Sequence, residues 1–145
     1  MGEKPVGLVQ ERGQVHTHDA ERRPAEPARL FYANVDEFVR FYLLPNWRRN
    51  TLHTSWCAQW WEHAEAITRL EALWESWEKQ RLEPGTGMAT WWRDFADHHM
   101  AVLTDRDAGP FFKCDPAKGR HEVPALWATE LPPEGMFRDG NEDEP

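Results

Sequence analysis

Apolar side chains recur at helical spacing along the middle of this chain. The recurring residues are three or four positions apart: Trp60, His63, Ile67, Leu70, Trp74 and Trp77. This spacing places them on one face of an α-helix, with charged residues such as Glu65 and Arg69 on the other faces. The pattern predicts a long central helix over residues 58–81, ended by a turn at residues 84–87, which read Pro-Gly-Thr-Gly.

Shorter helices are expected on both sides of this central helix. Asn34 with Glu37 three residues later has the spacing of a capping box, and apolar residues follow at helical spacing up to Pro45. A second short helix is expected from Trp47 onward. After the Pro-Gly turn, Thr86 is a candidate cap for a helix whose apolar side is formed by Met88, Trp91, Trp92 and Phe95.

The stretch after this helix favours a short β-hairpin. Residues 105–110 have the Asp, Gly and Pro content of a turn, and residues 111–114 (Phe-Phe-Lys-Cys) have strand character. Paired with residues 100–103, this strand would bring His99 close to Cys114. The expected fold class is therefore mainly α, a small single helical domain with one short β-hairpin and disordered N- and C-terminal tails.

Charge and proline content separate the ends of the chain from its middle. Residues 1–29 are rich in Gly and Pro, carry no net charge and are expected to be a disordered N-terminal segment. Residues 122–145 hold a net charge of −6 out of −8 for the whole chain, and residues 138–145 are expected to be an acidic disordered tail. The Trp-rich helical domain should span residues 30–137, and its last part, residues 123–137, contains three prolines and should lie over the helices as an extended segment.

Several functional classes find no support in the composition. No apolar stretch approaches the roughly 20 residues that span a bilayer, and two cysteines make no disulfide framework, so a reduced cytoplasmic protein is expected. Glycine-rich phosphate-binding motifs and a serine nucleophile motif are absent from the sequence. Nucleic-acid binding is not expected, because Arg48-Arg49 is the one adjacent basic pair in residues 30–121.

Cysteine and histidine residues form the candidate chemical site. The candidate ligands are both Cys and three of the five His of the expected domain: Cys57, His63, His99, Cys114 and His121. Four such side chains suit one tetrahedral zinc ion, although their spacing is not that of a zinc finger. The alternative is a histidine and two cysteines buried in the core without a metal, since free Cys often behaves as a small apolar residue.

The tryptophans are the other unusual feature. Eight of the nine lie between Trp47 and Trp92 and include two adjacent pairs, Trp60-Trp61 and Trp91-Trp92. Neighbouring positions on a helix point about 100° apart, so one ring of each pair can be central while the other lies at an edge. Most of these rings are expected in an aromatic core, and Trp61, Trp91 and Trp47 with Arg48 and Arg49 are the candidates for a partner-binding surface.

Taken together, these segments resemble an uncharacterised family of actinobacteria and their phages, the domain of unknown function 4913. The resemblance is carried by Leu44-Pro45-x-Trp47-Arg48-Arg49, Trp56-Cys57-x-x-Trp60-Trp61-x-His63, Gly85-Thr86-Gly87-Met88 and Gly109-Pro110-Phe111-x-x-Cys114. It implies an accessory or adaptor role in mobile-element biology, such as plasmids, conjugation or phages.

The leading functional hypothesis is a non-enzymatic binding module that docks an unidentified protein partner through its Trp-rich surface. The alternative is a zinc-binding domain or a metal-dependent enzyme that uses the Cys and His residues. A catalytic site would require an ion with one open coordination position, whereas four protein ligands make a structural site.

Overall fold

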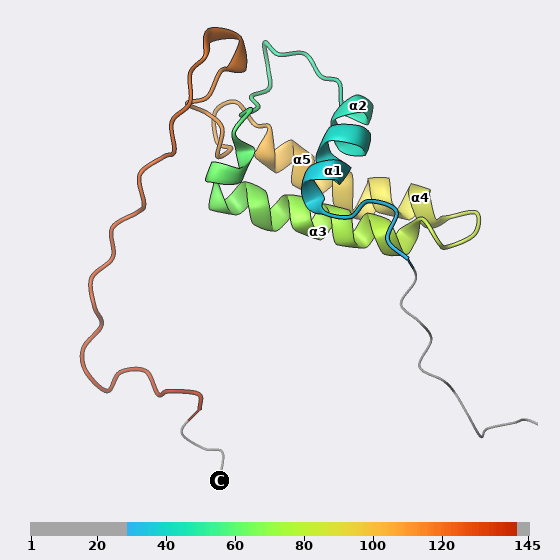
Figure 1. Ribbon diagram of the computed structural model, residues 1–145. Helices are drawn as coiled ribbons and strands as arrows, with labels where there is room; N and C mark the ends of the chain where they lie inside the picture. Colours follow the sequence, from blue (N-terminus) through green and yellow to red (C-terminus); the bar gives the residue numbers. More distant parts are fainter. Residues whose placement is uncertain (1–28, 142–145) are drawn as a thin grey trace, which may run out of the picture. The chain divides into compact units, whose positions relative to one another are not determined.

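The computed structural model describes residues 29–141, and their secondary structure is helical (Figure 1). Of the described residues, those from Phe31 onward belong to one unit. The elements in chain order are α1 (Val35–Phe38), a π-helical turn (Val39–Leu43), α2 (Leu44–Asn46), a 3₁₀ turn (Trp60–Glu62), α3 (Ala64–Gln80), α4 (Gly87–Trp91), a second π-helical turn (Trp92–Ala96), α5 (Asp97–Leu103) and a 3₁₀ turn (Pro116–Lys118). The disorder expected for residues 1–28 and 142–145 concerns positions outside the described residues.

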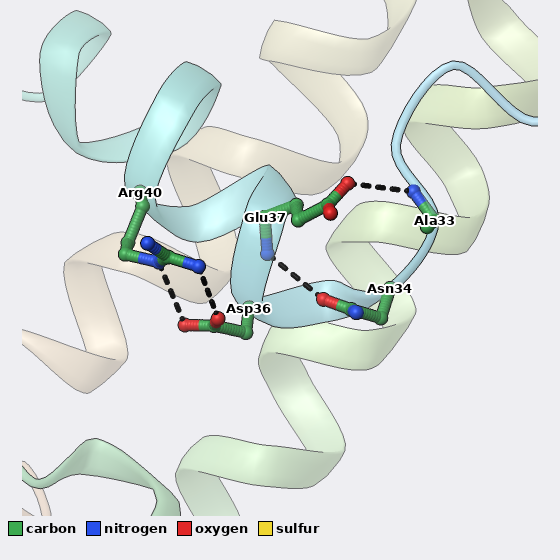
Figure 2. Close-up of polar contacts among 5 residues, drawn as sticks. All are labelled: Ala33, Asn34, Asp36, Glu37 and Arg40. Carbon is green, nitrogen blue, oxygen red and sulfur yellow. Dashed lines mark hydrogen bonds and ion pairs between the residues drawn. The ribbon is translucent and has the colours of Figure 1, made fainter.

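The helix expected after Asn34 is confirmed, and Asn34 and Glu37 close its first turn, although Glu37 binds the N–H of Ala33 and not that of the cap residue Asn34 (Figure 2). Asn34 Oδ1 accepts a hydrogen bond from the Glu37 N–H at 3.0 Å, and Glu37 Oε2 accepts one from the Ala33 N–H, also at 3.0 Å. Arg40 pairs with Asp36 one turn earlier at 2.7 Å. Such a cap stabilises a helix by about 1 kcal/mol, because it satisfies backbone donors that have no partner within the helix.

The second short helix expected from Trp47 onward is wrong. The helix instead runs on to Asn46, and at Trp47 the backbone leaves helical geometry with φ −115° and ψ 68°. The side chain of Asn46 donates to the Tyr42 carbonyl at 2.7 Å, and the Trp47 N–H bonds to Leu44, which closes the last turn. Residues 47–50 follow as irregular chain.

The central helix is confirmed as α3, but it is shorter than expected, and the face that it buries differs slightly from the expected apolar stripe. It begins at Ala64 and not near residue 58, because Trp60–Glu62 form a 3₁₀ turn and His63 is extended at φ −102°, ψ 113°. Its buried apolar residues are Ala66, Leu70, Leu73 and Trp77, while Ile67 and Trp74 of the expected stripe are half-buried. The buried face is turned in this way because α1 packs against α3, as do α4 and α5.

α4 and α5 form one continuous helical arm through the π-helical turn between them, and they lie along α3 (Figure 1). Trp91 at the end of α4 is fully buried and donates its indole N–H to the Leu73 carbonyl of α3 at 3.0 Å. This contact fixes the arm to the middle of the central helix. The core continues along the arm with Met100 and Leu103, both fully buried.

The expected β-hairpin is wrong, since residues 29–141 contain no β-strand beyond two isolated bridges. Residues 100–103 belong to α5, and residues 111–114 form successive turns. The carboxylate of Asp105 accepts the N–H groups of Asp107 and Ala108 at 2.9 Å, which makes a tight turn directly after the helix. Phe111 is then fully buried, so its apolar character reflects the core and not a strand.

Residues 123–137 are extended and irregular, as expected, but they do not lie over the helices. Leu126, Trp127 and Leu131 are 98%, 92% and 95% exposed. In Figure 1 this segment is drawn as a trace without helix or strand. None of the helices within residues 29–141 combines the length and apolar character needed to cross a membrane.

Candidate metal centre

Two cysteines and two histidines from distant parts of the chain meet at one point. The ligand atoms of Cys57, His63, Cys114 and His121 all lie within 4.8 Å of one another. Cys57 Sγ is 3.1 Å from Nδ1 of His121, and Cys114 Sγ is 3.6 Å from Nε2 of His63. Each cysteine therefore contacts a histidine that is 51 or more residues away in the sequence.

The first half of the site is a short reversal of the chain before α3. The Glu62 N–H bonds to the Gln59 carbonyl and the His63 N–H to the Trp60 carbonyl, both at 3.0 Å. This 3₁₀ turn reverses the chain between Cys57 and His63. The segment before it is tied to the end of α5 by the 2.9 Å bond from the Ser55 N–H to the Thr104 carbonyl.

The second half is a loop closed on itself. Asp115 and Arg120 exchange two backbone hydrogen bonds of 2.8 and 2.9 Å. Between them, Asp115 caps the Pro116–Lys118 turn, and Gly119 adopts a left-handed conformation with φ +64°. The reversal brings His121 back to Cys114, with Nδ1 and Sγ 3.9 Å apart. The loop thus presents two side chains to the same point.

The separations fit a tetrahedral metal shell. Zinc–sulfur bonds of about 2.3 Å and zinc–nitrogen bonds of about 2.0 Å put neighbouring ligand atoms roughly 3.3–3.8 Å apart at tetrahedral angles. The observed sulfur–nitrogen separations are 3.1, 3.6 and 3.9 Å. The cluster is therefore compatible with a zinc ion bound through the Nε2 atom of His63 and the Nδ1 atom of His121.

Burial controls the protonation of these groups. Burial raises the pKa of the Cys57 thiol to about 11, with a further contribution from the neighbouring Cys114. Burial also lowers the pKa of His63, and the nearby His121 adds to this. Without a cation, the pocket favours a neutral thiol and a neutral imidazole, and His63 is already in the form that binds a metal.

His99, the fifth candidate ligand, lies outside this cluster. Its Nδ1 atom is 2.9 Å from the guanidinium of Arg69, which can only donate, so His99 accepts this hydrogen bond. Burial lowers the pKa of His99, and the charge of Arg69 acts in the same direction. Cys114 contacts His63 and His121, and the expected proximity of His99 and Cys114 is wrong because the hairpin that would have created it does not form.

The candidate partner-binding residues are divided between surface and core. Trp61 is 54% exposed, two residues before the buried His63. Trp91 is fully buried and hydrogen-bonded to α3, which corrects its assignment to a partner surface. Trp47 is half-buried and stacks on Trp92 with an interplanar angle of 7°.

Arg48 and Arg49 lie beside this stack and are both exposed. The guanidinium of Arg49 is 3.7 Å from the ring centre of Trp47, a cation–π contact, and Arg48 donates to the Pro45 carbonyl. Both side chains are on the surface, and their partner-binding role stays a prediction.

Two contributors to the architecture carry no clear sequence signal. The thiol of Cys114 donates to the Glu122 carbonyl at 3.4 Å. Residue type does not predict this contact, because the acceptor belongs to the backbone. Glu78 resembles any other charged residue of α3, yet it is 6% exposed and binds the backbone of Phe31 and Tyr32. Its one sequence signal is its position directly after Trp77, at the edge of the buried stripe.

The chain belongs to the family described as domain of unknown function (DUF4913), whose model matches residues 32–133. This range includes all four residues of the Cys and His cluster. No curated protein and no solved structure matches the chain.

Proposed function

We propose that this member of the DUF4913 family is a non-enzymatic binding module whose fold is held together by one structural zinc ion. The observation that carries the proposal is the convergence of Cys57, His63, Cys114 and His121, whose ligand atoms lie within 4.8 Å of one another. These residues come from two chain reversals that share no regular secondary structure. A metal ion gives a physical reason for holding them together.

The chemistry of the ligands favours zinc. Two thiolates and two neutral imidazoles balance the charge of a divalent ion, so the complete site is electrically neutral, which suits a buried position. Cys57, His63 and Cys114 are 1%, 2% and 5% exposed. Soft sulfur ligands in tetrahedral geometry select zinc over the oxygen-binding ions magnesium and calcium.

The same geometry favours a structural site over a metal-dependent enzyme. Four protein ligands fill the tetrahedral shell of zinc, and a catalytic site needs one position for water or substrate. The metal would tie the loops at residues 57–63 and 114–121 to each other. A domain of about 100 residues gains much from such a link, because its core is small.

The binding role rests on the surface. Trp61 is exposed, and Arg48 and Arg49 form a cationic edge beside Trp47. Exposed tryptophan and arginine are the residues most enriched at interaction hot spots. Reduced thiols in a zinc site suit the cytoplasm, and an accessory role in mobile-element biology is the hypothesis that the family resemblance adds.

Metal content and thermal stability of matched variants test this function. We expect one zinc per chain in untagged wild-type protein purified without chelator, and loss of zinc with a lowered melting temperature in Cys57→Ser, Cys114→Ser and His63→Gln. His98→Gln is the control, because His98 is exposed and lies outside the cluster. Its zinc content and melting temperature should match the wild type.

Two results would contradict the proposal in different ways. Wild-type protein without zinc would make the four residues an ordinary buried cluster. Variants that lose the metal but keep the wild-type melting temperature would show that the ion is not structural, and would favour the metal-dependent enzyme.

A further inference from the structure

The segment 123–137 has the character of a docking peptide. It carries five large apolar side chains in exposed positions besides Val123: Leu126, Trp127, Leu131, Met136 and Phe137. Such a concentration of apolar surface marks an interaction site, because each exposed side chain of this size forgoes about 1.5–3 kcal/mol of burial energy. No other exposed stretch of the described residues carries as many large apolar side chains.

Prolines keep this segment extended. Pro124, Pro132 and Pro133 restrict the backbone and disfavour a return toward the helices. In polyproline geometry the 15 residues span roughly 45 Å, which exceeds the diameter of about 30 Å for a small domain. The segment begins two residues after His121 of the Cys and His cluster. It is therefore able to reach a second molecule.

The polar residues of the segment are acidic. Glu130 and Glu134 lie among the apolar side chains, and no Lys or Arg occurs between residues 122 and 137. A suitable binding surface would combine aromatic walls, which are the usual receptors of proline-rich extended peptides, with cations at its rim.

The domain itself carries such a surface around residues 51–56. Two hollows of about 490 and 130 Å³ share the lining residues Thr51, Thr54, Ser55 and Trp56. We name this surface the Trp47–Trp56 groove and define it by five residues that line one hollow or the other: Trp47, Arg49, Trp56, Arg106 and Lys118.

The charges of the groove complement those of the segment. Three of its residues are cations, and within residues 29–141 none of them forms an ion pair with a carboxylate: Arg49, Arg106 and Lys118. Asp115 is the one acidic residue that lines the two hollows, and its carboxylate already accepts a hydrogen bond from the Ala117 N–H of the Pro116–Lys118 turn. The groove thus offers unpaired positive charge beside two tryptophans.

We propose that residues 123–137 of one copy dock in the Trp47–Trp56 groove of a second copy of this chain. Exchange of the two segments gives a symmetric dimer in which each domain contributes one groove and one peptide. This inference rests on the proposed binding role and names its partner. Because Cys114 also lines the larger hollow, the metal centre shapes one wall of the groove.

The oligomeric state of the full chain tests the proposal. We expect the wild type to be a dimer by light scattering coupled to size-exclusion chromatography, with a monomer–dimer equilibrium on dilution. The double variant Leu126→Ala plus Trp127→Ala should raise the dissociation constant more than about 30-fold, as expected for loss of interface hot spots. Phe41→Ala is the matched control, because it removes an exposed aromatic ring that lines neither hollow and should remain dimeric.

An exchange of charges between the groove and the segment tests whether the groove is the docking site. Arg49→Glu plus Arg106→Glu should give a folded, zinc-loaded monomer, since both side chains are exposed; its melting temperature should fall only by the loss of the Arg49 contact with Trp47 and of the Arg106 bond to the Thr51 carbonyl. Adding Glu130→Lys and Glu134→Lys to that variant should restore the dimer. A dimer that persists in the Arg49 and Arg106 variant would overturn the assignment of the groove.

Zinc analysis of the same samples keeps this inference separate from the proposed function. A zinc-loaded wild type that stays monomeric at high concentration would overturn the dimer, whether the segment is free or docked on its own domain, and would leave the metal centre intact. A dimer without zinc would contradict the structural metal alone.

Discussion

At the scale of single residues, Glu78 shows how one buried carboxylate joins distant backbone. Its oxygens accept the N–H groups of Phe31 and Tyr32, each at 2.9 Å, and the Nε–H of Arg81 at 3.0 Å. Burial by itself raises the pKa of Glu78, but these donors outweigh it, and the pKa lies below its ordinary value. Glu78 therefore remains ionised and holds the chain that leads into α1.

Replacement of Glu78 by Gln should destabilise the protein by about 1–3 kcal/mol at neutral pH, because buried donors lose their charged acceptor. A lowered pKa gives stabilisation that is complete above the ordinary value of 4.5 and is lost as the pH falls through the folded-state pKa. Urea unfolding should therefore show a difference between wild type and Glu78→Gln at pH 7 that shrinks in acid.

Glu75→Gln is the control for this experiment, since Glu75 is exposed on the same helix. Parallel stability curves for wild type and Glu78→Gln across the acidic range would show that the Glu78 charge does not stabilise the fold.

The candidate metal ligands show what residue type can and cannot reveal. Cys and His are rare and chemically distinctive, so the sequence identifies Cys57, His63, Cys114 and His121 as candidates. The sequence does not show that His99 lies outside this cluster, because the position of His99 relative to Cys114 depends on whether residues 100–114 form a hairpin or a helix followed by turns. The position of Arg69, one turn away on α3 from Glu65, decides the environment of His99 only after the helices have packed.

At the scale of elements, the turn between α3 and α4 depends on close approach of the backbone. A Cβ atom added to Gly87 would collide with the Gln80 carbonyl oxygen and crowd Glu83, whereas one added to Gly85 meets open space. Gly85 instead has φ +79°, a conformation that costs other residues about 1–2 kcal/mol.

We expect Gly87→Ala to lower the melting temperature more than Gly85→Ala, because the first change displaces backbone and the second only strains it. Differential scanning calorimetry of the two variants measures this order. Equal melting temperatures for Gly87→Ala and wild type would show that the last turn of α3 can move freely.

Local pattern predicts the helices better than their ends. The capping residues Asn34 and Glu37 and the periodicity of α3 are local signals, and both helices form, although α3 begins at Ala64 and not near residue 58. The hairpin prediction is wrong because Phe111 is apolar for a tertiary reason: it packs edge to face on Trp56 and His63. A short apolar run has the same appearance in a strand and in a buried turn.

At the scale of the whole molecule, two kinds of contact hold the described chain together. Packing joins α1, α4 and α5 to α3 around Phe38, Leu70 and Trp91. The proposed metal centre joins the irregular chain before α3 to the loop after α5, where little regular structure is available. The periodicity of the sequence predicts the helix packing. Of the proposed metal centre it predicts only the candidate ligands, because their convergence depends on the complete fold.

Zinc K-edge X-ray absorption on the protein as purified is the decisive test of the metal centre, since it reports which atoms bind the metal. Two Cys and two His ligands predict a four-coordinate site with two sulfur atoms at about 2.3 Å and two nitrogen atoms at about 2.0 Å. Zinc bound by oxygen and nitrogen alone, or by one sulfur atom, would contradict the assignment of Cys57, His63, Cys114 and His121 as the metal centre.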